Sequence, residues 1–156
     1  YGAGLRRAEA AELDLDRLDE TTGAVQVIGK GNKERTTYVA GGALRAVKAW
    51  LLRRGAEPGP LLWPVDKIDA MRCRRLSDRA VAGILGRLAA RAKVDEVACH
   101  DMRRSMISDL IDAEVDLKTI QDMAGHSSVN TTARYDRRPG RRKLLAAERL
   151  VVPFEG

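Results

Sequence analysis

The stretch AVQVIGKGNKERTTYV, residues 24–39, predicts a β-hairpin in a chain whose other patterned segments are helical. Val25 and Val27 alternate with their neighbours as strand residues do, GKGN supplies turn residues, and residues 35–39 are rich in β-formers and return as the second strand. We therefore expect an α+β fold that is mostly helical, with one small antiparallel β-sheet near the N-terminus.

Apolar residues at helical spacing, together with capping residues, predict helices on both sides of this hairpin. The expected ranges are 7–15, 43–54, 77–92, 100–113, 116–125, 127–135 and 143–150. Ser77 is the expected N-cap of the third helix and Gly125 the expected C-cap of the fifth, while Ser127 or Ser128 caps the sixth.

Three of these helices carry an apolar stripe that is expected to face the core. The stripe residues are Ala8, Ala11 and Leu15 in the first helix, Val81, Ile84, Leu85 and Leu88 in the third, and Met102, Met106, Leu110 and Ile111 in the fourth. Pro139 and Gly140 predict a turn before the last helix, and residues 59–75 predict a loop.

Composition favours a nucleic-acid partner. The 156 residues suffice for one domain with a core, and they carry 28 Lys and Arg against 22 Asp and Glu, a net charge of +6. Arginine forks suit phosphate, and aromatic residues, at only 4%, are too few for a stacking platform, so double-stranded DNA fits better than a single strand. On charge alone, a generally basic soluble protein is an equally good interpretation.

The two cysteines, Cys73 and Cys99, form no spacing with histidine that resembles a zinc site. Free thiols suit a reducing compartment, so we expect a cytoplasmic protein. No signal peptide and no apolar run of membrane-spanning length are visible, which predicts no membrane partner.

Six residues in five separate motifs form a set suited to attack on a phosphodiester without a metal. They are Arg6 in GLRRAE, Lys30 in GKGNKER, His100 and Arg103 in HDMRRS, His126 in AGHSS and Tyr135 in ARYDRR. His100 and Arg103 lie one turn apart at a predicted helix start, where free N–H groups and the dipole favour phosphate.

Each motif by itself has a plainer interpretation. His100 could simply cap its helix, Lys30 could be a solvated turn lysine, and Tyr135 could be a half-buried residue at a helix end. Lys30 at a hairpin tip could instead deliver a proton to a leaving group, and cations near Tyr135 would favour its phenolate. Of the other tyrosines, Tyr38 is expected to pack against the hairpin.

Taken together, the motifs resemble the catalytic domain of the tyrosine recombinases, the phage-integrase and chromosome-dimer-resolvase group. The resemblance runs from GAGLRRAEAAELDLDRLD through VIGKGNKERTTYV and HDMRRS to AGHSSVNTTARY. It implies the DNA breaking–rejoining fold of that family, with residues 1–156 as one catalytic domain. Relatives carry a DNA-clamping domain ahead of the GLR motif, so we expect this chain to be truncated there, without that core-binding domain.

The resemblance also implies a role for each motif residue. Arg6 and Arg103 would clamp the scissile phosphate, His126 would hydrogen-bond it, and Glu9 would order Arg6. Tyr135 would attack the phosphorus and form a 3′-phosphotyrosyl link. His100 would accept or orient the tyrosine proton, and Lys30 would protonate the departing 5′ oxygen.

The implied activity is site-specific strand exchange on double-stranded DNA by a homotetramer, with no metal, small-molecule cofactor or ATP. Residues 144–154 could dock on a neighbouring protomer or, equally, on their own core. A type IB topoisomerase with the same chemistry and a DNA-binding module that has lost catalysis are the alternatives.

Overall fold

In a computed structural model of the chain, the described residues are 1–29, 31–95, 97–133, 135 and 139–149. In chain order the elements are α1 (Arg7–Glu12), the 3₁₀ turn η1 (Leu15–Arg17), β1 (Ala24–Ile28), β2 (Glu34–Tyr38), α2 (Gly41–Arg54), α3 (Asp78–Arg91), α4 (Cys99–Asp112), α5 (Leu117–Ala124), α6 (Val129–Ala133) and α7 (Pro139–Glu148). The mostly helical α+β prediction is confirmed.

The hairpin forms as predicted. Strands β1 and β2 pair antiparallel, with Ala24 opposite Tyr38 and Ile28 opposite Glu34. The tip residues Gly31 and Asn32 have φ of 75° and 58°, a left-handed conformation that these two residue types adopt readily.

The expectation that Tyr38 packs is wrong, since its side chain is 51% exposed. Thr37 pairs with Val25 on the inner face instead, and its Oγ1 donates to the Ala3 carbonyl over 3.0 Å. Strand alternation therefore turns Tyr38 outward.

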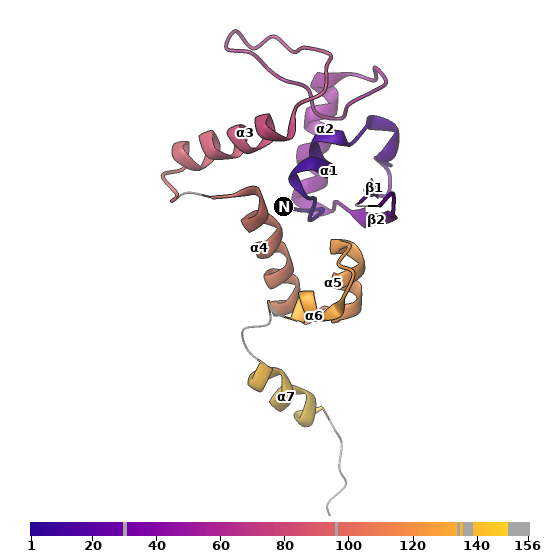
Figure 1. The fold of residues 1–156 in the computed structure, drawn as a ribbon, viewed down its shortest axis with the longest axis vertical. Helices are drawn as coiled ribbons and strands as arrows, with labels where there is room; N and C mark the ends of the chain where they lie inside the picture. Colours follow the sequence, from indigo (N-terminus) through magenta and orange to yellow (C-terminus); the bar gives the residue numbers. More distant parts are fainter. Residues whose placement is uncertain (30, 96, 134, 136–138, 150–156) are drawn as a thin grey trace, which may run out of the picture.

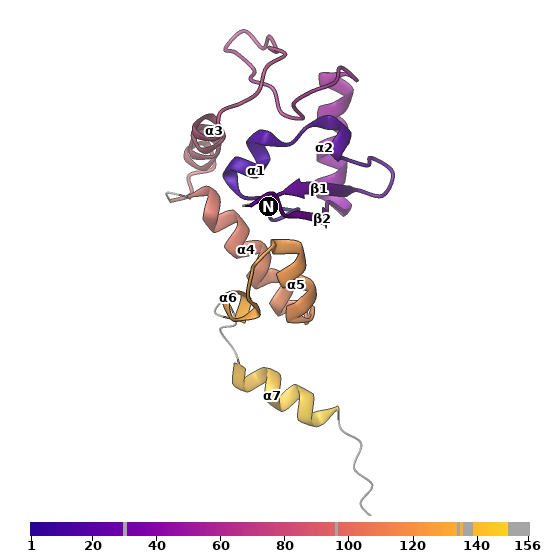
Figure 2. The same ribbon diagram turned by 45° about the vertical axis from the view of Figure 1, so that its right-hand side comes forward.

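The hydrophobic residues form two clusters, one in each half of the molecule. The first joins η1, the hairpin, α2 and the loop that contains Leu61, and the second joins α4 and α5 around Ile107 and Ile120. In both ribbon views α5 lies below the hairpin and beside α4 (Figures 1 and 2). The residues between these two halves form the candidate site.

Helix α1 is shorter than predicted and presents a different face. It ends at Glu12, because Leu13 leaves the helical conformation and enters the core. Ala8 is exposed, whereas Glu9 and Ala11 are buried, so the predicted stripe is wrong at Ala8. Because a buried carboxylate needs positively charged partners, the burial of Glu9 depends on its ion pairs with Arg6 and Arg35.

Helix α3 begins as predicted, with the Ser77 side chain accepting from the Ala80 amide over 3.1 Å. Its predicted stripe is only partly covered: Val81, Ile84 and Leu85 are half-buried, and Leu88 is 53% exposed. The helix packs on α1 and is flanked by two hollows, which leave part of its surface uncovered. The prediction that Leu88 faces the core is therefore wrong.

The later helices follow the predictions with small shifts. Gly125 ends α5 in the left-handed conformation at φ 62°, and Ser128 is the residue whose side chain accepts from the Asn130 amide over 3.2 Å. In α4, Met106 and Ile111 are buried as predicted, together with Ile107.

Helix α7 begins at Pro139, so the turn predicted at Pro139 and Gly140 is wrong. Proline suits the first turn of a helix because the amide it lacks would have no partner there. Leu144 is 60% exposed on this helix, and residues 150–154 of the predicted docking segment lie outside the described residues.

None of the helices described is both long and apolar enough to cross a membrane.

We predict that Ile107→Ala lowers the free energy of unfolding by about 2–5 kcal/mol, because the Ile107 side chain is completely buried between α4 and α5. Urea unfolding followed by circular dichroism measures this change. The control is Leu52→Ala, another aliphatic residue on a helix but 90% exposed, which should change stability little. Equal losses in the two variants would contradict this description of the core.

Candidate active site

Three arginines meet at the C-terminal end of α5. Arg35 Nε donates to the Met123 carbonyl over 3.0 Å, Arg103 Nη2 to the Ala124 carbonyl, and Arg6 Nη2 to the Gly125 carbonyl over 3.0 Å. The last carbonyls of a helix have no partner within the helix and carry the negative end of its dipole. Each arginine comes from a different segment, so α5 joins the start of α1, strand β2 and helix α4.

Glu9 is the carboxylate that binds two of these arginines. Arg35 forms a fork with it, Nη1 to Oε1 over 2.9 Å and Nη2 to Oε2 over 2.8 Å. Arg6 contributes Nη1 to Oε1 over 2.6 Å and its backbone amide to Oε2 over 2.7 Å. Burial alone would raise the pKa of Glu9, but the hydrogen bonds from Arg35 and Arg6 outweigh it and lower the pKa to about 2.

Arg103 is 2% exposed and is held by backbone oxygens, donating to the carbonyls of Gly4 and Ala124. Burial, with the nearby Arg6, lowers the pKa of Arg103 to about 10, so it stays protonated at neutral pH. Gly4 has φ of 60°, a left-handed conformation that favours glycine, and a Cβ there would lie 1.9 Å from Met106 Cε, so a larger residue would also displace the end of that side chain.

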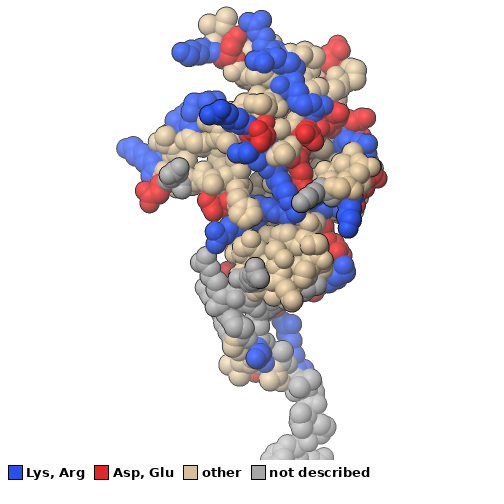
Figure 3. Space-filling model, viewed as in Figure 1, with Lys and Arg blue, Asp and Glu red and all other residues tan. Residues whose placement is uncertain are grey.

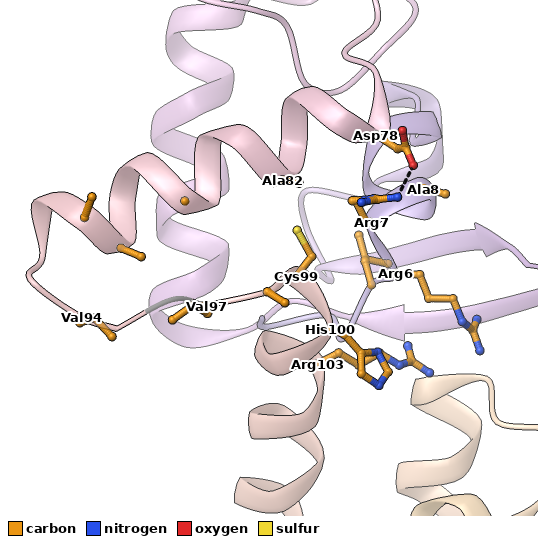
Figure 4. A pocket seen from close by; sticks show the side chains of 15 residues that line it. Arg6, Arg7, Ala8, Asp78, Ala82, Val94, Val97, Cys99, His100 and Arg103 are labelled. Atoms are coloured by element: carbon orange, nitrogen blue, oxygen red, sulfur yellow. Dashed lines mark ion pairs between the residues drawn. The ribbon is translucent and has the colours of Figure 1, made fainter.

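His100 and Arg103 line one hollow together with Arg6 (Figure 4). The hollow is about 790 Å³, and small residues of α3 and of the segment before α4 line its far end. His100 is exposed at the start of α4, and Arg7 pairs with Asp78 over 2.7 Å at the edge near α3. A ligand in this hollow would meet two arginines and an imidazole at one end.

His126 follows the left-handed Gly125 and lines a second hollow, of about 720 Å³, which Arg6 also lines. Burial, with positive charge from Arg103, Arg6, His100 and Arg35, lowers the pKa of His126 to about 4. At neutral pH its imidazole is therefore uncharged. Nδ1 lies 2.9 Å from Thr132 Oγ1.

Tyr135 lies in the turn after α6, close to His126. The two ring centroids are 6.3 Å apart and the planes differ by 24°. The Arg104 guanidinium carbon lies 5.9 Å from the centre of the Tyr135 ring, and the half-buried ring packs on the second hydrophobic cluster. Tyr135 also lines a polar hollow along α4, with Asp101, Ser105 and Asp109 among its neighbours.

The structure thus gathers Arg6, Glu9, His100, Arg103, His126 and Tyr135 around the end of α5. Lys30, the sixth residue of the predicted catalytic set, lies outside the described residues. Its neighbour Lys33 lines the second hollow.

Three further residues contact this site and were not predicted from the sequence: Arg35, Arg104 and Thr132. Arg35 was detectable, because it pairs with Val27 and so occupies an inward register position where an apolar residue is usual. A charge at such a position indicates a buried partner, here Glu9. Thr132 and Arg104 have no comparable pattern in the sequence.

In Figure 3, Lys and Arg side chains, with Asp and Glu among them, are spread over the upper part of the face, and some lie directly above a patch of uncharged side chains. Among the described residues, no group of three or more His, Cys, Asp or Glu side chains could hold a metal ion. The chemistry available at this site comes from guanidinium, imidazole and phenol groups, which together suit an anionic phosphate.

Comparison with known proteins places these residues in a family. The model of the phage integrase family matches residues 1–139. The chain is 38% identical to "Tyrosine recombinase XerC" of Azotobacter vinelandii over 136 residues, 86% of this chain and 44% of that protein. It is also 38% identical to the protein of the same name in Myxococcus xanthus, over 143 residues, 86% of this chain and 46% of that one. The chain therefore spans less than half the length of these relatives.

Solved structures have the same fold. XerA recombinase superposes with a TM-score of 0.74 at 22% identity, over 96% of this chain and 55% of that one. XerH site-specific recombinase bound to its difH substrate superposes with a TM-score of 0.69 at 25% identity, over 95% of this chain and 43% of that one. The predicted breaking–rejoining fold is confirmed.

We predict that Glu9 makes the fold sensitive to acid. The pKa of Glu9 is about 2 in the folded protein against an ordinary 4.5, so its ionised form stabilises the fold above pH 4.5, and this contribution is lost as the pH falls toward 2. The full contribution is about 3 kcal/mol. Urea unfolding between pH 7 and pH 2 should therefore show Glu9→Gln much less stable than wild type at pH 7, with the difference narrowing below pH 4.5.

The matched control is Glu12→Gln, an exposed glutamate on the same helix, which should follow the wild-type curve. A constant difference between Glu9→Gln and wild type across this pH range would contradict the role of the Glu9 charge.

Proposed function

Because the chain belongs to the phage integrase family, we propose that residues 1–156 are the catalytic domain of a tyrosine-type site-specific recombinase. This enzyme would cleave and rejoin double-stranded DNA through a 3′-phosphotyrosyl intermediate. Side chains would act where other enzymes use a metal. The phosphotyrosyl link would keep the energy of the broken phosphodiester bond, so that rejoining needs no ATP. The observation that carries the proposal is the convergence of Arg6, Arg103 and His126 beside Tyr135 at the end of α5.

The arginines and His126 would hold the scissile phosphate. Besides the N–H groups that bond to Glu9 and to backbone carbonyls, the guanidinium groups of Arg6 and Arg103 each have further N–H donors. These would bind the two non-bridging oxygens, whose negative charge grows as the phosphorus becomes pentacoordinate. Neutral His126 supplies a hydrogen-bond donor instead of a further charge. Because these donors are already fixed by the α5 carbonyls and Glu9, little reorganisation is needed when the phosphate arrives.

Tyr135 would be the nucleophile. Its phenol oxygen attacks the phosphorus, the bond from phosphorus to the 5′ oxygen breaks, and the DNA is left with a 3′-phosphotyrosine and a 5′ hydroxyl. His100 takes the phenol proton, and Lys30 protonates the departing 5′ oxygen. In rejoining, a 5′ hydroxyl attacks the phosphorus and gives its proton to Lys30. The bond from phosphorus to the phenol oxygen breaks, and His100 returns a proton to the phenol.

The proposed partner is double-stranded DNA, on which four copies would act at paired sites. Its support is the net charge of +6 and the solved structures of XerH with its difH substrate and of the Tn1549 integrase with transposon DNA. We place this activity in the cytoplasm, which the free cysteines Cys73 and Cys99 favour.

We predict that Tyr135→Phe abolishes covalent capture of DNA, since only the attacking oxygen is removed. The assay incubates the protein with duplexes that carry candidate sites and a nick near the cleavage point, followed by denaturing gels and peptide mapping. Wild type should give an adduct at Tyr135, and Tyr38→Phe, altered on the exposed face of the hairpin, should do the same. Gel shifts should show nearly unchanged DNA affinity for Tyr135→Phe. Binding by wild type without any adduct would favour a DNA-binding module instead.

We predict that Arg103→Lys slows cleavage by about 10²-fold or more, because a lysine cannot form the two-oxygen fork. Single-turnover rates on the nicked duplex measure the effect, and circular dichroism checks that the fold persists. The control is Arg53→Lys on α2, whose exposed pair with Asp69 lies away from the site. Similar rates for the two variants would argue against a clamp at Arg103.

A further inference from the structure

Thr132 contacts both His126 and Tyr135, and the proposed cleavage chemistry does not use it. Its side chain is fully buried on α6, with Oγ1 lying 2.9 Å from His126 Nδ1. Its carbonyl accepts from the Tyr135 amide over 3.0 Å. One residue thus contacts both the histidine and the tyrosine.

The direction of the bond between Thr132 and His126 depends on which ring nitrogen of His126 carries the proton. A hydroxyl on a helix can donate to a carbonyl one turn earlier. Within the part of the chain that the structure describes, the Thr132 hydroxyl makes no such bond, which leaves its proton available for His126 Nδ1 to accept. An accepting Nδ1 on a neutral ring requires the proton to be on Nε2.

We propose that Thr132 is a positioning residue that fixes His126 as the Nε2–H tautomer and sets the ring's distance from Tyr135. The inference rests on the proposed function, because it assigns His126 the task of donating to the phosphate. With Nδ1 occupied by Thr132, Nε2 is the nitrogen left to donate within the hollow that Arg6 also lines.

The geometry explains why a threonine suits this place. A β-branched side chain has few χ1 rotamers on a helix, so the buried hydroxyl has a narrow range of positions. The backbone bond from Tyr135 to Thr132 then transmits this placement to the turn that holds the tyrosine. The nearly parallel rings of His126 and Tyr135, 24° apart, agree with such a fixed arrangement.

The first test is the histidine tautomer, which does not depend on DNA or on cleavage. Long-range ¹H–¹⁵N NMR spectra distinguish Nε2–H from Nδ1–H, and the chain contains only two histidines, so a His100→Gln variant assigns both. Wild type and Thr132→Ser should show the proton on Nε2 and a hydrogen-bonded Nδ1. Thr132→Val, which keeps the shape but lacks the hydroxyl, should lose the hydrogen-bonded Nδ1 signal. A wild-type proton on Nδ1 would overturn the inference without any variant.

The second test is cleavage of the nicked duplex. Thr132→Val should be about 10- to 100-fold slower than wild type with similar DNA affinity, since a misplaced donor costs rate more than binding. Thr132→Ser should recover most of the rate, and Thr21→Val, exposed in the turn before β1, should match wild type. Equal rates for Thr132→Val and wild type would refute the positioning role. If wild type itself forms no adduct, the proposed function fails, and the tautomer measurement still decides the assignment of Thr132.

Discussion

The contact between three arginines and three successive carbonyls at the end of α5 is the interaction on which this structure depends. A helix terminus leaves its last carbonyls unpaired, and here Arg35, Arg103 and Arg6 satisfy those of Met123, Ala124 and Gly125. The bonds of Arg35 and Arg6 hold the hairpin half of the molecule against the half built from α4 and α5, and Arg103, which lies on α4, adds its bond to the Gly4 carbonyl. Because three cations so close together repel one another, the buried Glu9 carboxylate is needed to keep two of them in place.

The same arrangement prepares the site for an anion. Three guanidinium groups face one carboxylate, so the local charge remains positive, and the surrounding positive charge helps keep His126 neutral and able to donate without adding charge. Gly125 is required twice over: its φ is 62°, and a Cβ would lie 2.7 Å from Arg35 Cδ. Gly125 therefore fixes both the turn that presents His126 and the space that Arg35 occupies. Thr132 links this turn to Tyr135, because its side chain contacts His126 and its carbonyl accepts from the Tyr135 amide.

The predictions of which helix residues are buried failed in α1 and α3 for one reason. The spacing of apolar residues suggests which face of a helix is buried, but it does not show which other elements pack against that face. In α1 the apolar spacing chose Ala8, whereas the arginines at α5 draw Glu9 inward and leave Ala8 exposed. In α3 the stripe was recognised, but no described element covers Leu88. Arg35 could have been found from its inward register opposite Val27, while Thr132 could not, since nothing local distinguishes it from Thr131.

The sequence by itself determined the elements and the motifs: the hairpin, most helix ends, and the residues that mark the family. These depend on caps, turns and alternation between residues close in the chain, such as Ser77 with Ala80 or Asp116 with Thr119. Only the tertiary structure decided which groups meet. Arg103 reaches Gly4 across 99 positions and Arg6 reaches Gly125 across 119. No local pattern encodes such contacts, because they arise when separate helices and strands bury their apolar faces together and bring unpaired polar groups within reach of one another.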